Sequence, residues 1–321
     1  MPPYLVPAHT ENCGSRLAPA EVKVTQSVHA QSTVAAGVLG RLTDVLATQP
    51  NPYRTASYSV SGNAKILEGE HLQQSVLDGR SGVVRLENLP LLQRAMSNLS
   101  RPVSRSPFAE AYAALLDNSL ASTESLGALL EPVALTAAFE SDTLSRQLEQ
   151  VAKVVSTRAA LDEERQVFYV SLGGFDTHAS ELEAVHEKLA QVNGAIASFV
   201  DEMKAQGIWE QVTLLTASDF GRTLGSNGAG TDHAWGGHYA ILGGSVNGGR
   251  IHGQYPSALD EHSDVNIGRN HRMLPTTPWE MIWYGIAEWF GADIDGSLDE
   301  LLPNAANFGA YQRLTAAQLY K

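Results

Sequence analysis

The feature that most constrains the fold is a strand–helix–strand succession between residues 165 and 217. RQVFYVSL, residues 165–172, is an aromatic and β-branched run that leads into Gly-Gly, which is typical of a buried strand. Residues 180–206 repeat apolar side chains every three or four positions and precede Gly207, which indicates a long helix. QVTLLTA, residues 211–217, predicts a second strand. This order favours a parallel sheet with helices on its faces.

Further elements complete the α/β pattern. HYAILGG, residues 238–244, predicts a third strand. Apolar spacing or a proline at the first helical position predicts four more helices, at 37–47, from Pro107 onward, at 142–160 and from Thr277-Pro278 onward. We expect one domain. Residues 1–105 would form its irregular N-terminal portion, and residues 106–321 its α/β core.

Composition excludes several classes of partner. Lys and Arg total 22 against 35 Asp and Glu, which gives a formal net charge of −13. Phosphate backbones and anionic membranes would be repelled overall, so we expect no nucleic-acid partner. No apolar run reaches the length of a membrane span, so we expect no membrane insertion. A small anionic ester remains compatible, because a bound metal or one Arg reverses the local field. Nothing in the sequence indicates an oligomeric state.

The cysteine content and the start of the chain bear on location. Cys13 is the single cysteine, so neither an intrachain disulfide nor a cysteine-based zinc site can form. The start, MPPYLVPAHTENCGS, has neither the basic nor the apolar region of a secretory signal. The expectation is therefore either a cytoplasmic protein or an exported one whose true N-terminus lies upstream.

Three glycine-flanked groups of acidic residues and histidines adjoin the predicted strands. They contribute six candidate metal ligands, namely Asp176 and His178 after the first strand, Asp219 after the second, and Asp232, His233 and His238 ahead of the third. Ligands of parallel α/β sheets bind beyond the carboxyl ends of the strands. Carboxylate oxygens and imidazole nitrogens suit Zn²⁺ or Mn²⁺, so the pattern predicts a site for one or two divalent ions.

Two alternatives accompany this prediction. Asp, Gly, Thr and Asn are also ordinary turn residues, and each group falls where a loop is expected. Arg222, three residues after Asp219, is placed to contact a tetrahedral oxyanion as a catalytic residue, but an exposed loop Arg would give the same pattern.

At this level of detail the sequence resembles a known family. GGFDTH, VTLLTASDFGRT, GTDHAWGGHYAILGG and GR…LPTTPW…WFG, in this order, resemble the family called domain of unknown function 1501. That family is similar to the alkaline phosphatase and sulfatase superfamily. The resemblance is specific over about 142–309 and looser over 27–48. It implies an alkaline-phosphatase-like three-layer α/β sandwich with a mostly parallel central sheet and a metal centre at the strand ends.

The resemblance also implies roles for single residues. Asp176 and His178, with His233 or His238, would serve one ion, and Asp219 would serve a second. Phe220 follows Asp219 where the superfamily usually has histidine. Family members begin with a strand that ends in Gly-Gly-x-Asp just before a Leu-Val-Pro stretch, whereas this chain starts at MPPYLVPAH. The resemblance therefore implies that the first strand and one aspartate ligand lie upstream, and it leaves the nucleophile unassigned.

Three functions are compatible with these features. The first is a metal-dependent hydrolase of phosphate or sulfate esters, impaired if the first strand is absent. The second is a non-catalytic metal-binding or interaction protein derived from the same family. The third is another reaction at the same centre, such as isomerisation by phosphoryl transfer.

Overall fold

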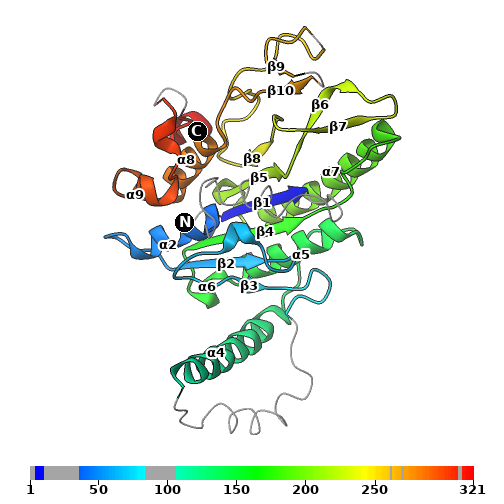
Figure 1. Cartoon of the computed structure of the whole chain (residues 1–321). Helices are drawn as coiled ribbons and strands as arrows, with labels where there is room; N and C mark the ends of the chain where they lie inside the picture. The colour runs from blue at the N-terminus through cyan, green and yellow to red at the C-terminus, as the bar shows by residue number, and fades with distance from the viewer. Residues whose placement is uncertain (1–3, 11–35, 84–105, 261, 269–270, 310–312) are drawn as a thin grey trace.

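The computed structural model describes residues 4–10, 36–83, 106–260, 262–268, 271–309 and 313–321. A six-stranded sheet of order β3-β2-β4-β1-β5-β8 lies at its centre (Figure 1). Its strands are β1 (Tyr4–Thr10), β2 (Thr55–Ser59), β3 (Ser75–Val76), β4 (Arg165–Ser171), β5 (Val212–Ser218) and β8 (Ile241–Gly243). β8 runs antiparallel to β5, and the other neighbours pair in parallel. The mostly parallel sheet expected from the sequence is confirmed.

Helices connect and cover these strands. The α-helices are α2 (Val38–Thr48), α4 (Pro107–Leu130), α5 (Thr143–Ser156), α6 (Arg158–Leu161), α7 (Glu181–Ala205), α8 (Trp279–Phe290), α9 (Ile294–Leu301) and α10 (Ala316–Leu319). Short 3₁₀ turns are η1 (Lys65–Leu67), η2 (Trp209–Gln211) and η3 (Ala305–Asn307). Among the residues that the structure describes, no helix combines the length and apolar character needed to cross a membrane.

Both faces of the sheet are buried, and β4 shows how. Val167 and Tyr169 belong to one hydrophobic cluster, which includes residues of α2, α8 and α9. Phe168 and Val170 point the other way, into a second cluster with residues of α5 and α7. Successive side chains of a strand face opposite sides, so a strand covered on both faces reads as a continuous apolar run. This is why RQVFYVSL predicts a buried strand correctly.

β1 is a strand that the sequence analysis did not predict. Tyr4–Thr10, which contains the YLVP stretch, lies between β4 and β5 in the sheet. Leu5 is in parallel register with Val167 of β4 and with Thr213 of β5. Pro7 argues against a central strand in the sequence, because a residue without an N–H cannot donate to the strand ladder.

The predicted helices form, but two of them bury less than expected. Within α7, Phe199 and Met203 are buried, whereas Leu182 and Leu189 near its start are exposed despite their helical spacing. Figure 1 shows α4 apart from the sheet, and its Leu126 and Leu130 are buried at the end that joins the body. A periodic apolar pattern predicts a helix, but not how far a neighbouring element covers it.

Two small hairpins lie beyond the carboxyl edge of the sheet (Figure 1). β6 (Gly221–Ser226) pairs with β7 (Thr231–Ala234), and β9 (Asn266–Ile267) pairs with β10 (Arg272–Met273), both antiparallel. Backbone hydrogen bonds join them, since Leu224 donates to the His271 carbonyl at 2.8 Å and Gly236 to the Met273 carbonyl at 3.0 Å. Of the six candidate ligands, Asp232 and His233 lie on the first of these hairpins, and Asp176 and His178 lie on the loop after β4.

Two sequence features fall outside the described residues. Cys13 and residues 27–35, which begin the looser part of the family resemblance, are among them. The rest of that looser part, from Ala36 to Thr48, is described and includes α2, whose Val38, Leu39 and Leu42 are buried as their spacing predicts.

Candidate metal centre

The loop between β4 and α7 presents the first two candidate ligands, Asp176 and His178. After β4 ends at Ser171, the chain passes through Gly174, whose φ is +95°. This left-handed conformation is readily adopted by glycine and is strained for other residues. The Gly-Gly pair of the motif thus lets the chain turn at the edge of the sheet before Asp176.

The β6–β7 hairpin presents a third candidate ligand, His233. The hairpin follows β5 closely, and Arg222 is in register with His233 across it. Glycine allows a close approach here as well, since a Cβ at Gly221 would lie 2.1 Å from the Gly236 carbonyl oxygen. The hairpin thereby brings His233 to the loop that carries Asp176, 57 residues earlier.

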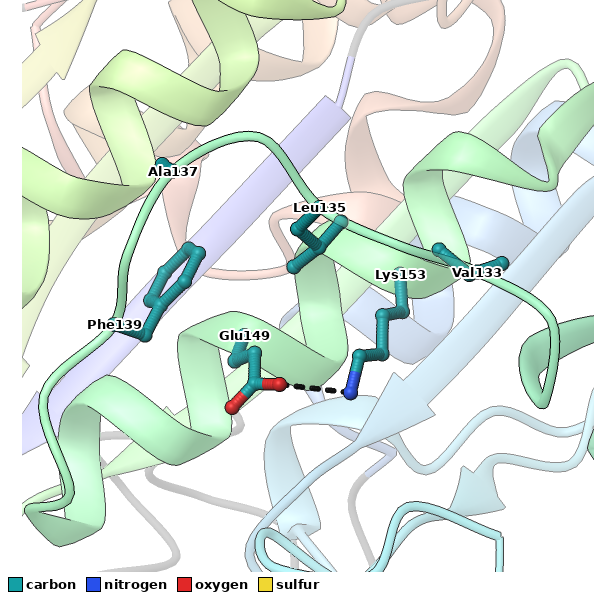
Figure 2. Close-up of a pocket in the computed structure, with 6 residues that line it drawn as sticks. All are labelled: Val133, Leu135, Ala137, Phe139, Glu149 and Lys153. Carbon is teal, nitrogen blue, oxygen red and sulfur yellow. Dashed lines mark ion pairs between the residues drawn. The ribbon is translucent and has the colours of Figure 1, made fainter.

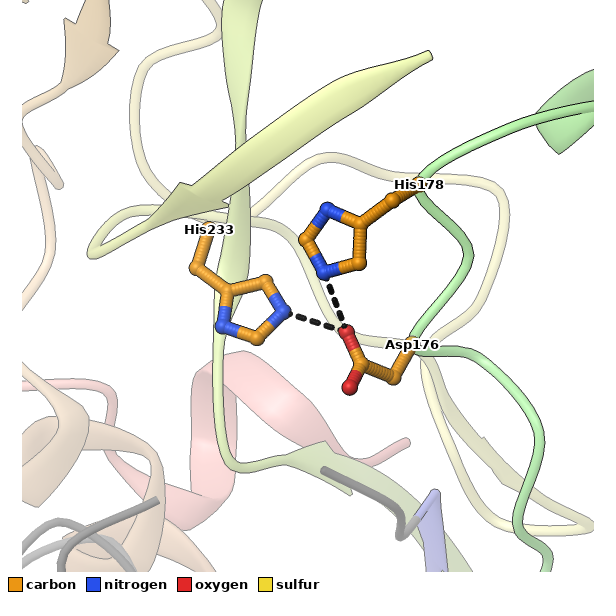
Figure 3. A group of neighbouring side chains, drawn as sticks. All are labelled: Asp176, His178 and His233. Carbon is orange, nitrogen blue, oxygen red and sulfur yellow. Dashed lines mark hydrogen bonds and ion pairs between the residues drawn. The ribbon is translucent and has the colours of Figure 1, made fainter. Parts of the chain in front are cut away.

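Asp176, His178 and His233 converge on one point (Figure 3). The Asp176 Oδ1 atom lies 2.6 Å from His233 Nε2 and 2.8 Å from His178 Nε2. The two imidazole rings are 5.1 Å apart between centroids. His178 is 52% exposed, whereas Asp176 and His233 are 21% and 27% exposed. The cluster therefore lies at an open rim rather than in the interior.

The donor set fits a divalent transition-metal ion. One carboxylate oxygen and two imidazole nitrogens lie within 4.8 Å of one another. Zinc bonds of about 2.0–2.1 Å in a tetrahedral arrangement separate neighbouring ligand atoms by roughly 3.3 Å, so the two contacts to Asp176 would open by roughly 0.5 to 0.7 Å. Three protein ligands with a remaining open position are typical of catalytic rather than structural zinc sites.

Asp232 and Phe220 flank the cluster. Asp232 Oδ1 accepts a hydrogen bond from Asn227 Nδ2 at 2.9 Å and lies 3.9 Å from His178 Nδ1, the nitrogen that faces away from Asp176. At 3.9 Å this carboxylate is too far from Nδ1 to accept a hydrogen bond, so the two groups are ion-pair neighbours. Phe220 stacks on His233, with 4.1 Å between ring centroids. Phe220, the residue after Asp219, thus packs against a candidate ligand.

Asp219 does not belong to the three-residue cluster. It directly follows β5, where the sequence predicts it, and its neighbour is Tyr239. The Tyr239 hydroxyl donates to the Ser218 carbonyl at 3.3 Å, so the hydroxyl is covered although the residue as a whole is exposed. This burial, and then the negative charge of Asp219, raise the pKa of Tyr239 to about 12.

His238 also lies outside the cluster. It is exposed, and its ring packs near Tyr255 at 6.1 Å between centroids. It follows His233 by five positions, and in that interval the chain leaves β7, passes two glycines and turns towards β8. The resemblance left His233 and His238 as alternatives beside Asp176, and the geometry brings His233 there.

Arg222 donates hydrogen bonds to both segments that carry the clustered residues. Its Nη1 donates to the Thr231 carbonyl at 2.7 Å, and its Nη2 donates to the Phe175 carbonyl and to Thr177 Oγ1. Glu181, the first residue of α7, accepts from the Thr231 hydroxyl at 2.7 Å. The sequence analysis did not name Glu181. The signal that could have found it is its position, an acidic residue three positions after GGFDTH at the start of the predicted helix.

Two shallow pockets lie away from these residues. One, of about 250 Å³, is lined by Val133, Leu135, Ala137, Phe139 and the ion pair of Glu149 with Lys153 (Figure 2). The other, of about 270 Å³, lies beside Tyr53 and Gly291. Neither includes a member of the cluster.

Comparison with solved structures gives distant likenesses. The chain is similar to the structure described as Ps i-CgsB in complex with k-i-k-neocarrahexaose, at 9% identity and a TM-score of 0.40, over 95% of this chain and 76% of that one. It is also similar to the PsFucS1 sulfatase from Pseudoalteromonas sp., at 10% identity and a TM-score of 0.28, over 70% of this chain and 56% of that one. These likenesses are too distant to assign a fold or an activity.

The family comparison is more direct. No curated protein matches the chain. One family model, described as protein of unknown function (DUF1501), matches residues 10–273 and so spans both the loop after β4 and the β6–β7 hairpin. The match covers well over half of the sequence and confirms the resemblance found in its motifs. The protein therefore belongs to the DUF1501 family.

Proposed function

We propose that this protein is a metal-dependent hydrolase of phosphate or sulfate esters whose ion is held by Asp176, His178 and His233. The observation that carries the proposal is the convergence of two imidazole nitrogens on one carboxylate oxygen, at 2.6 and 2.8 Å. The proposal includes the alkaline-phosphatase-like three-layer sandwich, which the helices on both faces of the sheet support.

Each residue has a distinct part in this proposal. A divalent ion at the cluster, Zn²⁺ or Mn²⁺, would stabilise the negative charge that develops on the ester oxygens. Asp176 holds both imidazoles in place, and Asp232 lies beside the outward nitrogen of His178. Asp219 remains the proposed ligand of a second ion, and His238 remains the alternative to His233 that the resemblance named for the first. The partly exposed rim leaves the ester accessible to water and to the ion.

The second candidate is a non-catalytic metal-binding protein of the same family. The exposure of His178, 52%, favours it, because enzymes usually bind small substrates in enclosed pockets that exclude water. The two candidates predict the same metal content but different turnover, and the experiment below separates them.

The test has two stages, performed on the full 321-residue chain. Elemental analysis after long dialysis without chelator should give about one equivalent of Zn²⁺ or Mn²⁺. Turnover of an aryl phosphate and an aryl sulfate is then measured with each ion, with and without chelator. Turnover that chelator abolishes supports the hydrolase. Bound metal without turnover supports the non-catalytic candidate. Folded protein without transition metal overturns both.

A further inference from the structure

We propose that Arg222 and Glu181 form a tether that positions the two segments carrying the metal ligands, and that Arg222 acts through this tether rather than on the substrate. The two segments are the loop 175–178, with Asp176 and His178, and the strand β7, with His233. The proposal rests on the proposed metal centre. It replaces the expectation that Arg222 contacts a substrate oxyanion.

The guanidinium of Arg222 bridges the two segments. Its Nη1 donates to the Thr231 carbonyl at 2.7 Å, two residues before His233. Its Nη2 donates to the Phe175 carbonyl and, at 3.3 Å, to Thr177 Oγ1, the residues on either side of Asp176. The planar fork of arginine places donors on separate nitrogens in a fixed geometry, which the compact ammonium of lysine does not match.

Glu181 completes the tether from the start of α7. Both of its carboxylate oxygens lie within 2.8 Å of the Thr231 hydroxyl, which donates to them. Its Oε1 also lies 3.7 Å from Arg222 Nε. An acidic residue in the first turn of a helix interacts favourably with the helix dipole, so the carboxylate is well placed there. Glu181 thereby joins the β7 strand to the helix that follows the ligand loop.

A third contact runs from Arg222 to a ligand through an aromatic ring. The guanidinium lies over the Phe220 ring, 5.2 Å from its centroid, and the same ring stacks on His233 at 4.1 Å. Arg222 therefore contacts the residues on both sides of Asp176, the backbone two residues before His233, and the ring that packs on His233. Arg222 and Glu181 are both 21% exposed, so solvent screens their interaction only in part.

These contacts make the tether a device for ligand placement. Groups that orient metal ligands from behind typically change metal affinity by roughly 10- to 100-fold when they are removed. The three ligands come from two segments, one before α7 and one after β5 in the sequence. Their mutual position therefore depends on contacts between the two segments, such as those of Arg222 and Glu181. Loss of the tether should weaken metal binding while the buried sheet keeps the chain folded.

The test compares metal binding by the full chain and four variants after removal of metal. Arg222→Lys and Glu181→Gln disrupt the tether, and Thr231→Val removes the hydroxyl that Glu181 accepts from. Arg250→Gln is the matched control, because Arg250 is an exposed loop residue. Affinities for Zn²⁺ come from competition with a chromophoric chelator, and the visible spectrum of bound Co²⁺ reports the ligand geometry. Circular dichroism and Tm of the metal-free proteins check folding.

We expect Arg222→Lys and Glu181→Gln to bind Zn²⁺ roughly 10- to 100-fold more weakly, with an altered Co²⁺ spectrum. Thr231→Val should show a smaller loss, and it carries the test if Arg222→Lys fails to fold. Arg250→Gln should match the parent. If the parent binds neither ion, the metal centre itself is overturned and the tether with it.

Inorganic phosphate distinguishes the tether from direct anion contact. If the parent binds metal and all tether variants bind it equally well with an unchanged Co²⁺ spectrum, the tether alone is overturned. The same holds if Arg222→Lys keeps the metal affinity of the parent but loses affinity for phosphate in the Zn²⁺-loaded protein, because Arg222 would then contact the anion. Weaker metal binding with parent-like phosphate affinity at saturating Zn²⁺ supports the tether.

Discussion

The sheet core and the rim above it are held together by different forces. In β4, every residue from Gln166 to Ser171 is buried, and the two hydrophobic clusters pack on opposite faces. The rim, comprising the loop 173–180 and the β6–β7 hairpin, is mostly half-buried or exposed and is joined by hydrogen bonds and ion pairs. The free energy gained by burying apolar side chains is roughly proportional to the buried area and does not depend on direction. The strength of a hydrogen bond depends on the distance and angle between its donor and acceptor. Stability and metal binding should therefore respond to different substitutions.

The largest expected effect is a loss of stability from the core. Phe199 of α7 is fully buried in the cluster beneath β4. Phe199→Ala should lower the free energy of unfolding by about 3–5 kcal/mol, because it removes a large apolar side chain and leaves a cavity. Denaturant unfolding measures the loss, and the folded fraction should still bind Zn²⁺ with the stoichiometry of the parent. A change below about 1 kcal/mol would show that the cluster is not packed as described.

A substitution of a proposed ligand at the rim should affect metal binding much more than stability. Asp176→Ala should leave metal-free stability within about 1 kcal/mol of the parent, because Asp176 lies outside the core. Zn²⁺ at about 100 times its Kd should stabilise the parent by about 2.7 kcal/mol and the variant hardly at all. Thermal unfolding with and without Zn²⁺ measures both quantities. His262→Ala, on an exposed loop, is the control; equal Zn²⁺ stabilisation of all three proteins would remove Asp176 from the ligand set.

A smaller loss of stability is expected at Asp142, a polar residue that begins the core helix α5. Its carboxylate caps α5 by accepting from the Leu144 and Ser145 amides, and it also accepts from Gln191 of α7 at 2.7 Å. Asp142→Ala should cost about 1–2 kcal/mol at neutral pH, as for other N-caps. Urea unfolding measures it, with exposed Asp201→Ala as the control. A cost equal to that of the control would contradict the cap.

The cost at Asp142 should also depend on pH. Burial alone would raise the pKa of Asp142, but the hydrogen bonds from Ser145 and Gln191 outweigh it, and the pKa is lowered from 3.8. A carboxyl with a lowered folded-state pKa stabilises the protein above its unfolded pKa, and that contribution is lost as the pH falls through the folded value. The difference between the parent and Asp142→Ala should therefore be constant near neutrality and shrink below about pH 4.

The sequence predicted the core better than the rim, for physical reasons. The buried faces of α2 and α5 followed from spacing, as Leu42 and Leu148 show, because burial imposes a period on the sequence. β1 was missed because Pro7 is atypical of a central strand, and the start of α7 projects beyond its cover, so Leu182 is exposed. Local periodicity carries no information about either feature.

The candidate site shows the same limit. The motifs indicated which residue types gather at the carboxyl edge, and Asp176 and His178 were paired from the start. That His233 rather than His238 meets them depends on the register of a short polar hairpin, which has no apolar period to reveal it. The contacts from Arg222 to Thr177 and from Glu181 to Thr231 join residues 45 and 50 positions apart, so they become visible only in the folded chain.

The most direct test of the proposed metal centre is a crystal structure of the full chain grown with Zn²⁺, with anomalous scattering measured across the zinc edge. The proposed ligand set predicts an anomalous peak within about 2.0–2.2 Å of one Asp176 carboxylate oxygen and of the Nε2 atoms of His178 and His233. A crystal with no peak at this point, or with zinc bound at His238 and away from Asp176, would contradict it.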